Sequence, residues 1–142
     1  MRYLLDTNVL SELRRVSPHP KVITFLSSHP IDDPYISVVT IAEIRFGIDT
    51  LADPVRRAGL YDWLTWNVRP TFDDRVLPIT EDIMLRWRLL VEEGRKAGHT
   101  FSQPDLLIAA TAIQHDMTIA TRNRRDFEKA NVLVVNPWED NL

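Results

Sequence analysis

The 142-residue chain contains no cysteine, and this absence excludes disulfide bonds, thiolate nucleophiles and zinc sites with sulfur ligands. It contains only four glycines, and none of them lies in a Gly-x-Gly-x-x-Gly or Walker sequence, so no nucleotide-binding phosphate loop is expected. No apolar run approaches the roughly 20 residues that span a bilayer. Only three apolar residues separate Arg2 from Asp6, too few for the apolar region of a secretory signal. We therefore expect a cytoplasmic protein with no membrane segment.

The chain also lacks a strong charge of either sign, because its formal net charge is −3. Such a small charge argues against a protein held on nucleic acid by bulk attraction to phosphate, so any nucleic-acid activity must rest on a local site. Hydrophobic residues make up 44% of the chain and charged residues 26%, a balance typical of globular proteins. The length is that of one domain, and we expect a single domain over residues 1–142.

Short apolar or β-branched runs alternate along the chain with segments of helical periodicity. The runs that predict strands cover residues 3–5, 35–39, 75–79, 117–121 and 132–135. The predicted helices follow Asp6, span residues 22–30, begin at Thr40, Asp53, Thr80 and Ser102, and occupy residues 124–130. Strands that alternate with helices favour parallel pairing and right-handed crossovers. The sequence therefore predicts an α/β fold, a three-layer sandwich with a central, mostly parallel sheet.

Acidic and amide side chains stand at the ends of the predicted strands. Asp6 ends the first strand, Glu43 lies one helical turn after the second, and Asn123 follows a later strand by two residues. Asp105 begins an apolar helix. Since ligands of open α/β sheets bind beyond the carboxyl ends of the strands, we expect these four side chains to share one crevice.

Three carboxylates in one crevice repel one another, and a divalent cation relieves the repulsion. Oxygen ligands without histidine or cysteine favour Mg²⁺ or Mn²⁺, ions that keep several waters and leave positions open for a phosphate oxygen and an attacking water. Such an ion stabilises charge on phosphate and lowers the pKa of bound water. The acids therefore indicate metal-dependent hydrolysis of a phosphodiester.

Each acid also has a purely structural interpretation. Thr40-Ile41-Ala42-Glu43 and Ser102-Gln103-Pro104-Asp105 both fit helix capping boxes, so Glu43 and Asp105 could serve only to cap helices. Asp6 could likewise cap the helix that follows it, although an acid that ends an apolar strand has fewer structural explanations. The four positions together carry more information than any one of them.

Four sequence motifs contain these acids and the amide. In chain order they are Leu4-Leu5-Asp6-Thr7-Asn8; Thr40-Ile41-Ala42-Glu43-Ile44 with Gly47; Asp105-Leu106-Leu107-Ile108-Ala109-Ala110-Thr111-Ala112; and Ala120-Thr121-Arg122-Asn123 followed by Asp126-Phe127. All four resemble motifs of the PIN-domain family of ribonucleases. The terminal Asn136-Pro137-Trp138 is similar to VapC- and FitB-like members of that family. The likeness covers nearly the whole chain, in the family's order and spacing.

The resemblance implies a Mg²⁺-dependent endoribonuclease, with Mn²⁺ as the other candidate ion, that is the toxin of a type II toxin–antitoxin pair. It implies that Asp6, Glu43 and Asp105 form the catalytic acidic pocket, with Asp6 and Asp105 as direct metal ligands. Asn123 stands where some relatives carry a fourth acid, and Asp126 is the alternative residue for that place. The implied partners are RNA, a VapB-like antitoxin and a second copy of the chain in a homodimer, with DNA contacted only indirectly through the antitoxin.

Two alternatives stay open at this point. One is a PIN-like RNA- or protein-binding module that has lost catalysis, with Asn123 as the suspect position, although the three remaining acids argue against it. The other concerns six arginines, which could line an RNA groove or lie on solvated helix faces. They are Arg14, Arg15, Arg45, Arg122, Arg124 and Arg125. Arg122 is nearest to the site by its motif position, whereas Trp138 is expected to serve packing rather than base stacking.

Overall fold

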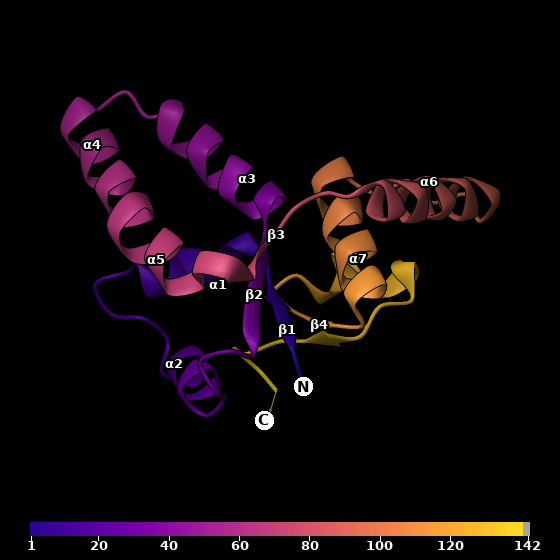
Figure 1. Ribbon diagram of the computed structural model, residues 1–142, viewed down its shortest axis with the longest axis horizontal. Helices are drawn as coiled ribbons and strands as arrows, with labels where there is room; N and C mark the ends of the chain where they lie inside the picture. The colour runs from indigo at the N-terminus through magenta and orange to yellow at the C-terminus, as the bar shows by residue number, and fades with distance from the viewer. Residues whose placement is uncertain (141–142) are drawn as a thin grey trace.

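A computed structural model (Figure 1) describes residues 1–140, and residues 141–142 of the predicted domain lie outside the described part. Within residues 1–140 five strands form one sheet in the order β3-β2-β1-β4-β5, and every neighbouring pair is parallel. The strands are β1 (Tyr3–Leu5), β2 (Pro34–Ser37), β3 (Val76–Leu77), β4 (Thr118–Ala120) and β5 (Val134–Val135). The strand order places β1 at the centre of the sheet, next to both β2 and β4.

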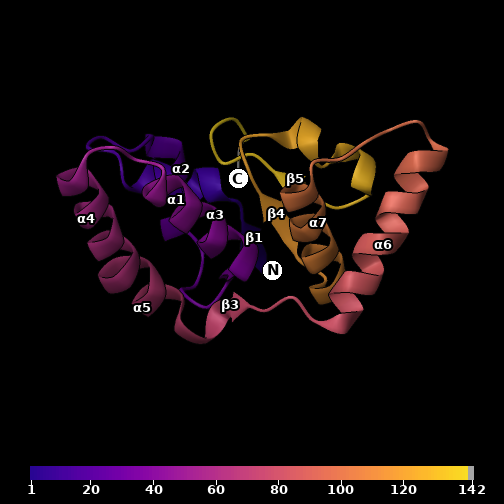
Figure 2. The same ribbon diagram turned by 90° about the horizontal axis from the view of Figure 1, so that it is seen from above.

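Helices cover both faces of this sheet (Figures 1 and 2), with α1 to α5 on one side and α6 and α7 on the other. The α-helices are α1 (Thr7–Leu13), α2 (Pro20–Ser27), α3 (Val38–Asp49), α4 (Pro54–Trp63), α5 (Arg69–Phe72), α6 (Glu81–Lys96) and α7 (Gln103–His115). A π-helical turn (Leu64–Val68) joins α4 to α5, and 3-10 turns cover Asp73–Arg75, Arg124–Asp126 and Glu128–Ala130. This arrangement confirms the predicted α/β three-layer sandwich.

The side chains of β1 alternate between two hydrophobic cores. Tyr3 and Leu5 pack among residues of α1, α2 and α3, whereas Leu4 packs among residues of α6 and α7. All three side chains are buried. A strand directs successive side chains to opposite faces, so a strand buried on both faces is a continuous apolar run. The central strand is therefore rigidly packed, and it fixes the place of the residue that follows it.

The junction between β2 and α3 differs from the sequence prediction. The strand expected over residues 35–39 ends at Ser37, and α3 begins at the next residue rather than at Thr40. Ser37 caps the helix, because its Oγ accepts a hydrogen bond from the backbone N–H of Val39 at 3.0 Å. The predicted capping box of Thr40 and Glu43 is wrong, since Thr40 lies inside the first turn.

Two other elements also differ from the bounds expected from the sequence. The helix expected over residues 124–130 is a pair of short 3-10 turns, and the strand expected over residues 75–79 has only two residues. The long helix after Thr80 is confirmed, since Thr80 Oγ1 accepts from the backbone N–H of Ile83 and Gly98 follows the helix with a φ of 71°. No helix within residues 1–140 is long and apolar enough to cross a membrane.

Candidate active site

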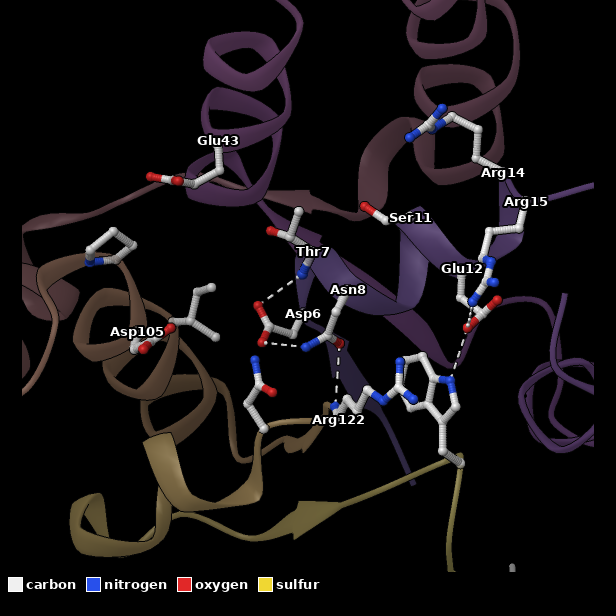
Figure 3. A pocket seen from close by; sticks show the side chains of 14 residues that line it. Asp6, Thr7, Asn8, Ser11, Glu12, Arg14, Arg15, Glu43, Asp105 and Arg122 are labelled. Atoms are coloured by element: carbon white, nitrogen blue, oxygen red, sulfur yellow. Dashed lines mark hydrogen bonds and ion pairs between the residues drawn. The ribbon is translucent and has the colours of Figure 1, made fainter. Parts of the chain in front are cut away.

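A crevice of about 640 Å³ opens at the carboxyl ends of β1 and β4 (Figure 3). Its lining residues are Asp6, Thr7, Asn8, Ser11, Glu12, Arg14, Arg15, Glu43, Pro104, Asp105, Ile108, Arg122, Asn123 and Trp138. All four predicted site residues are among them, and they come from four separate segments of the chain. The structure thus brings together the residues that the motifs singled out.

Asp6 lies at the bottom of this crevice, and its side chain is only 7% exposed. Because Leu5 pairs with Ala120 in the sheet, the residues after β1 and β4 emerge side by side. The Asp6 carboxylate accepts hydrogen bonds from the Thr7 backbone N–H and the Thr121 hydroxyl, both at 2.8 Å. Burial raises the pKa of Asp6 above its usual value, and the negative charge of Asp105 adds to that rise, although the two hydrogen bonds oppose it.

Asp105 lies in the first turn of α7 and is half-buried. Ser102 is the N-cap of this helix, and its hydroxyl donates to Asp105 Oδ2 at 2.6 Å. The capping interpretation is therefore correct for Ser102, but it leaves the Asp105 carboxylate on the crevice wall. Burial is the main cause of the raised pKa of Asp105, and the charge of Asp126 raises it further.

Glu43 lies on α3 at the edge of the crevice, and its side chain is exposed. Figure 3 shows that its carboxylate does not point toward Asp6 in this conformation. The helix N-terminus is satisfied by Ser37, so capping does not explain Glu43.

Asn123 is exposed in the loop after β4 and lines the crevice, whereas Asp126 lies one short turn further along. The Asn123 backbone N–H donates to Thr121 Oγ1 at 3.0 Å, which ties the loop to the bottom of the crevice. Asp126 is not among the lining residues, yet its charge raises the pKa of both Asp6 and Asp105. Asn123 therefore contributes an amide to the wall, and Asp126 contributes a nearby negative charge.

Sequence reasoning assigned no role to Asn8 or Thr121, although both stood inside quoted motifs. Asn8 Nδ2 donates to Thr121 Oγ1 at 3.2 Å, and Asn8 Oδ1 accepts from the Arg122 backbone N–H at 3.3 Å. The Thr121 hydroxyl in turn donates to Asp6. These contacts fasten the end of β1 to the loop after β4, and they are invisible in the sequence because they join residues more than 110 positions apart.

The donor set of the crevice suits a hard divalent cation, since it consists of carboxylate, amide and hydroxyl oxygens. Within residues 1–140 no group of three histidine or acidic side chains lies close enough together to hold an ion. An ion such as Mg²⁺ keeps several waters and needs only one or two carboxylates from the protein. The pair formed by Asp6 and Asp105 therefore fits such an ion.

The PIN domain family model matches residues 3–133 of the chain. The chain belongs to the PIN domain family. It is 37% identical over 137 residues to the toxin FitB of Neisseria gonorrhoeae, a match that covers 96% of this chain and 99% of FitB. It is 35% identical over 136 residues to the VapC ribonuclease Y4jK of Sinorhizobium fredii, which covers 96% and 97% of the two chains.

Solved structures give the same result. The fold matches the crystal structure of FitAcB from Neisseria gonorrhoeae with a TM-score of 0.89 and 37% identity over 96% of this chain and 98% of the other. It matches the structure of FitAB bound to an IR36 DNA fragment with a TM-score of 0.90 and 36% identity over 99% and 98%. The predicted family is therefore confirmed, as is the ribonuclease and toxin class to which these relatives' names belong.

Proposed function

We propose that this chain is a Mg²⁺-dependent endoribonuclease, able to use Mn²⁺ in its place, and the toxin of a VapBC-type toxin–antitoxin pair. The observation that supports it most directly is the meeting of Asp6 and Asp105, two buried or half-buried carboxylates, in one open crevice. The relatives' names point to the same class, since they include a VapC ribonuclease and a toxin.

In this proposal Asp6 and Asp105 hold the ion, and Asn123 adds a neutral oxygen ligand or a hydrogen bond to one of the ion's waters. When bound, the ion stabilises the charge that develops on the scissile phosphate and lowers the pKa of the attacking water. Glu43 is exposed at the crevice edge, where it can accept the proton of that water. The protein's own part is to hold two carboxylates in place with neutral donors, so that their charge stays available to a cation.

The partners follow from the relatives and from the charge of the crevice. Two of the similar structures hold FitA together with FitB, and one of them includes DNA. We infer an antitoxin of the VapB type whose basic segment pairs with the acidic crevice, and DNA contact only through that antitoxin. The protein acts in the cytoplasm on RNA, as a homodimer of single domains that span residues 1–142.

The proposal is tested with purified protein, labelled RNA and defined metal. RNA should be cleaved in MgCl₂ or MnCl₂ and left intact in excess EDTA, because clustered carboxylates alone do not activate water near neutral pH. Undiminished cleavage in chelator would overturn the metal mechanism. Full absence of cleavage with every RNA pool and metal, from a folded protein, would favour the catalytically inactive binding module.

The toxin assignment has a separate test. Expression of the chain alone should slow bacterial growth, and co-expression with the neighbouring reading frame should restore growth and yield a stable complex with suppressed RNase activity. If no neighbouring product binds and expression leaves growth unchanged, the toxin role is wrong even where RNA cleavage is found.

A further inference from the structure

The crevice has a second, positively charged half. Of the six arginines considered in the sequence, three line it, namely Arg14, Arg15 and Arg122. Figure 3 shows Arg14 and Arg15 on the opposite side of Asp6 from Asp105 and Glu43. A strand of RNA that places one phosphate at the carboxylates would therefore pass guanidinium groups within the same crevice.

Arg122 is the best anchored of the three. Its backbone N–H donates to Asn8 Oδ1 at 3.3 Å, and its backbone carbonyl accepts from Asn136 Nδ2 at 3.4 Å. Its guanidinium carbon lies 5.2 Å from the centroid of the Trp138 ring, within the range of a cation–π contact. The backbone of Arg122 is thus held by two hydrogen bonds, and its exposed side chain lies against the Trp138 ring.

The ring under Arg122 is itself fixed. Trp138 is 7% exposed, its indole Nε1–H donates to Glu12 Oε1 at 3.0 Å, and its backbone N–H donates to Asn136 Oδ1 at 2.9 Å. Glu12 is 4% exposed and forms an ion pair with Arg15 at 3.5 Å. The buried Glu12 carboxylate thus fixes the Trp138 ring, and this ring lies under Arg122. An arginine on a solvated helix face would not need such contacts.

The Arg122 guanidinium is near enough to Glu12 for its charge to help lower the pKa of that carboxyl, but the two groups do not form an ion pair. Within the described part of the chain, no carboxylate lies within ion-pair distance of this group. Stacking on an aromatic face leaves the N–H edge of a guanidinium available, and that edge matches two oxygens of a phosphate. Arg124 in the same loop differs, because it is paired with Asp140 at 2.6 Å.

We propose that Arg122, set on the face of Trp138, binds the RNA phosphate next to the scissile one, and that Trp138 and Glu12 are positioning residues for it. This inference rests on the proposed function, since it names the part of the RNA that the crevice recognises. The neighbouring phosphate carries a full negative charge and would be repelled by the acids unless a cation met it on the other side of Asp6.

The inference predicts a particular kinetic change for Arg122→Gln. Loss of a charge-assisted hydrogen bond should weaken RNA binding by about 10- to 100-fold. The phosphate in question does not react, so the contact is the same in the ground state and the transition state, and KM should rise while kcat changes little. The slope of log affinity against log salt concentration should fall in magnitude by about 0.7, the value for one phosphate contact on a single strand.

The positioning role needs its own variants. Trp138→Leu removes the aromatic face and should raise KM like Arg122→Gln, whereas Trp138→Phe keeps a face and should recover part of the affinity. The double variant Arg122→Gln with Trp138→Leu should be no weaker than the weaker single variant, because both changes remove one contact. Thermal unfolding and circular dichroism establish that each variant is folded.

The decisive experiment measures binding of a random-sequence, fluorescently labelled single-stranded RNA to the full chain in excess EDTA, over a range of salt concentrations. Arg56→Gln is the matched control, because Arg56 is exposed in α4 and the substitution removes the same charge.

Weaker RNA binding and a lower salt slope for Arg122→Gln, but not for Arg56→Gln, would support the inference. Equal binding by the two variants overturns it, even if the wild-type chain cleaves RNA when Mg²⁺ is added. Absence of cleavage on adding Mg²⁺ counts against the proposed function alone, because the binding comparison does not depend on catalysis.

Discussion

The substitution Asp6→Asn separates the two functions that Asp6 could have, capping α1 and binding a cation. Asparagine is as good an N-cap as aspartate, so the cap contact with the Thr7 N–H survives the change. The Thr121 hydroxyl and Asn8 Nδ2 donate to Asp6 Oδ2 at 2.8 and 3.5 Å, and the amide nitrogen that takes this place in asparagine accepts from neither. The variant removes a negative charge that is 7% exposed and has no ion-pair partner within residues 1–140.

The magnitude follows from these contacts. Without metal, Asp6→Asn should lose no more than about 2 kcal/mol of stability, because the hydrogen bonds at Oδ2 are lost but a buried charge is removed. With Mg²⁺ at about 100 times its dissociation constant, the wild type should gain about 2.7 kcal/mol. For a chain of this size that gain is a rise in Tm of roughly 5–10 °C. The Asp6→Asn variant should gain little, and its RNA cleavage should fall by at least about 100-fold.

The assay is thermal unfolding in EDTA and in a MgCl₂ titration, followed by RNA cleavage with the same samples. Asp53→Asn is the matched control: Asp53 caps α4 through a hydrogen bond to the Val55 N–H at 3.0 Å, and it is exposed outside the crevice. This control should keep the wild-type response to Mg²⁺. An equal rise in Tm for the Asp6→Asn variant and the wild type would remove Asp6 from the metal site. If Asp6→Asn lowers the free energy of unfolding in EDTA by more than about 2 kcal/mol, the role of Asp6 is structural.

Three further substitutions test other contacts of the structure. Asn123→Asp should tighten Mg²⁺ binding in calorimetry, because it adds a carboxylate to the crevice wall, and unchanged affinity would place Asn123 outside the ion's surroundings. The Trp138 hydrogen bond lowers the pKa of Glu12, so ionised Glu12 stabilises the fold at neutral pH, and this contribution is lost as pH falls through the lowered pKa. Urea unfolding should therefore show Glu12→Gln less stable than wild type at pH 7, with a gap that closes in acid, and a gap that widens in acid would contradict the sign. Gly94→Ala should destabilise the protein by about 1–3 kcal/mol in urea unfolding, since its Cβ would lie 2.8 Å from the His99 carbonyl oxygen, and an unchanged midpoint would show that the α6 terminus yields easily.

The order of strands and helices could be predicted because apolar runs alternate with helical periodicity, and the runs of β1 and β4 are buried at every position. The β2–α3 boundary could not, since Ser37 and Thr40 are both acceptable caps and the intervening valines favour a strand by propensity. The helix begins after Ser37 because Ser37 pairs with Leu77 at the end of β2 while its Oγ caps α3. Tertiary pairing thus decided what local propensity left open.

The acids of the site could be predicted because each stands beside a strand end or helix start that the pattern reveals. Their surroundings could not. Thr121 and Asn8 hold Asp6 and the loop after β4 through side-chain contacts, and nothing in local sequence marks a hydroxyl as a donor to a residue 115 positions away. Trp138 was expected to pack, and it does, but its use as the base for Arg122 depends on the route of the C-terminal segment back to α1.

The separation of charges within the crevice explains why its arginines form no ion pair with Asp6 or Asp105, although Arg15 pairs with Glu12. The hydrogen-bond partners of Asp6 are the Thr7 backbone N–H, the Thr121 hydroxyl and the Asn8 side-chain amide, and all three are neutral. Arg122 directly follows Thr121, whose hydroxyl donates to Asp6, yet the guanidinium of Arg122 lies over the Trp138 ring. The charge of Arg122 helps to lower the pKa of Glu12, the carboxyl that accepts from the Trp138 indole. In the proposed function, the contact with Trp138 would keep the Arg122 guanidinium away from a metal ion at Asp6 and leave the guanidinium edge open to phosphate. Trp138 would then serve both halves of the crevice.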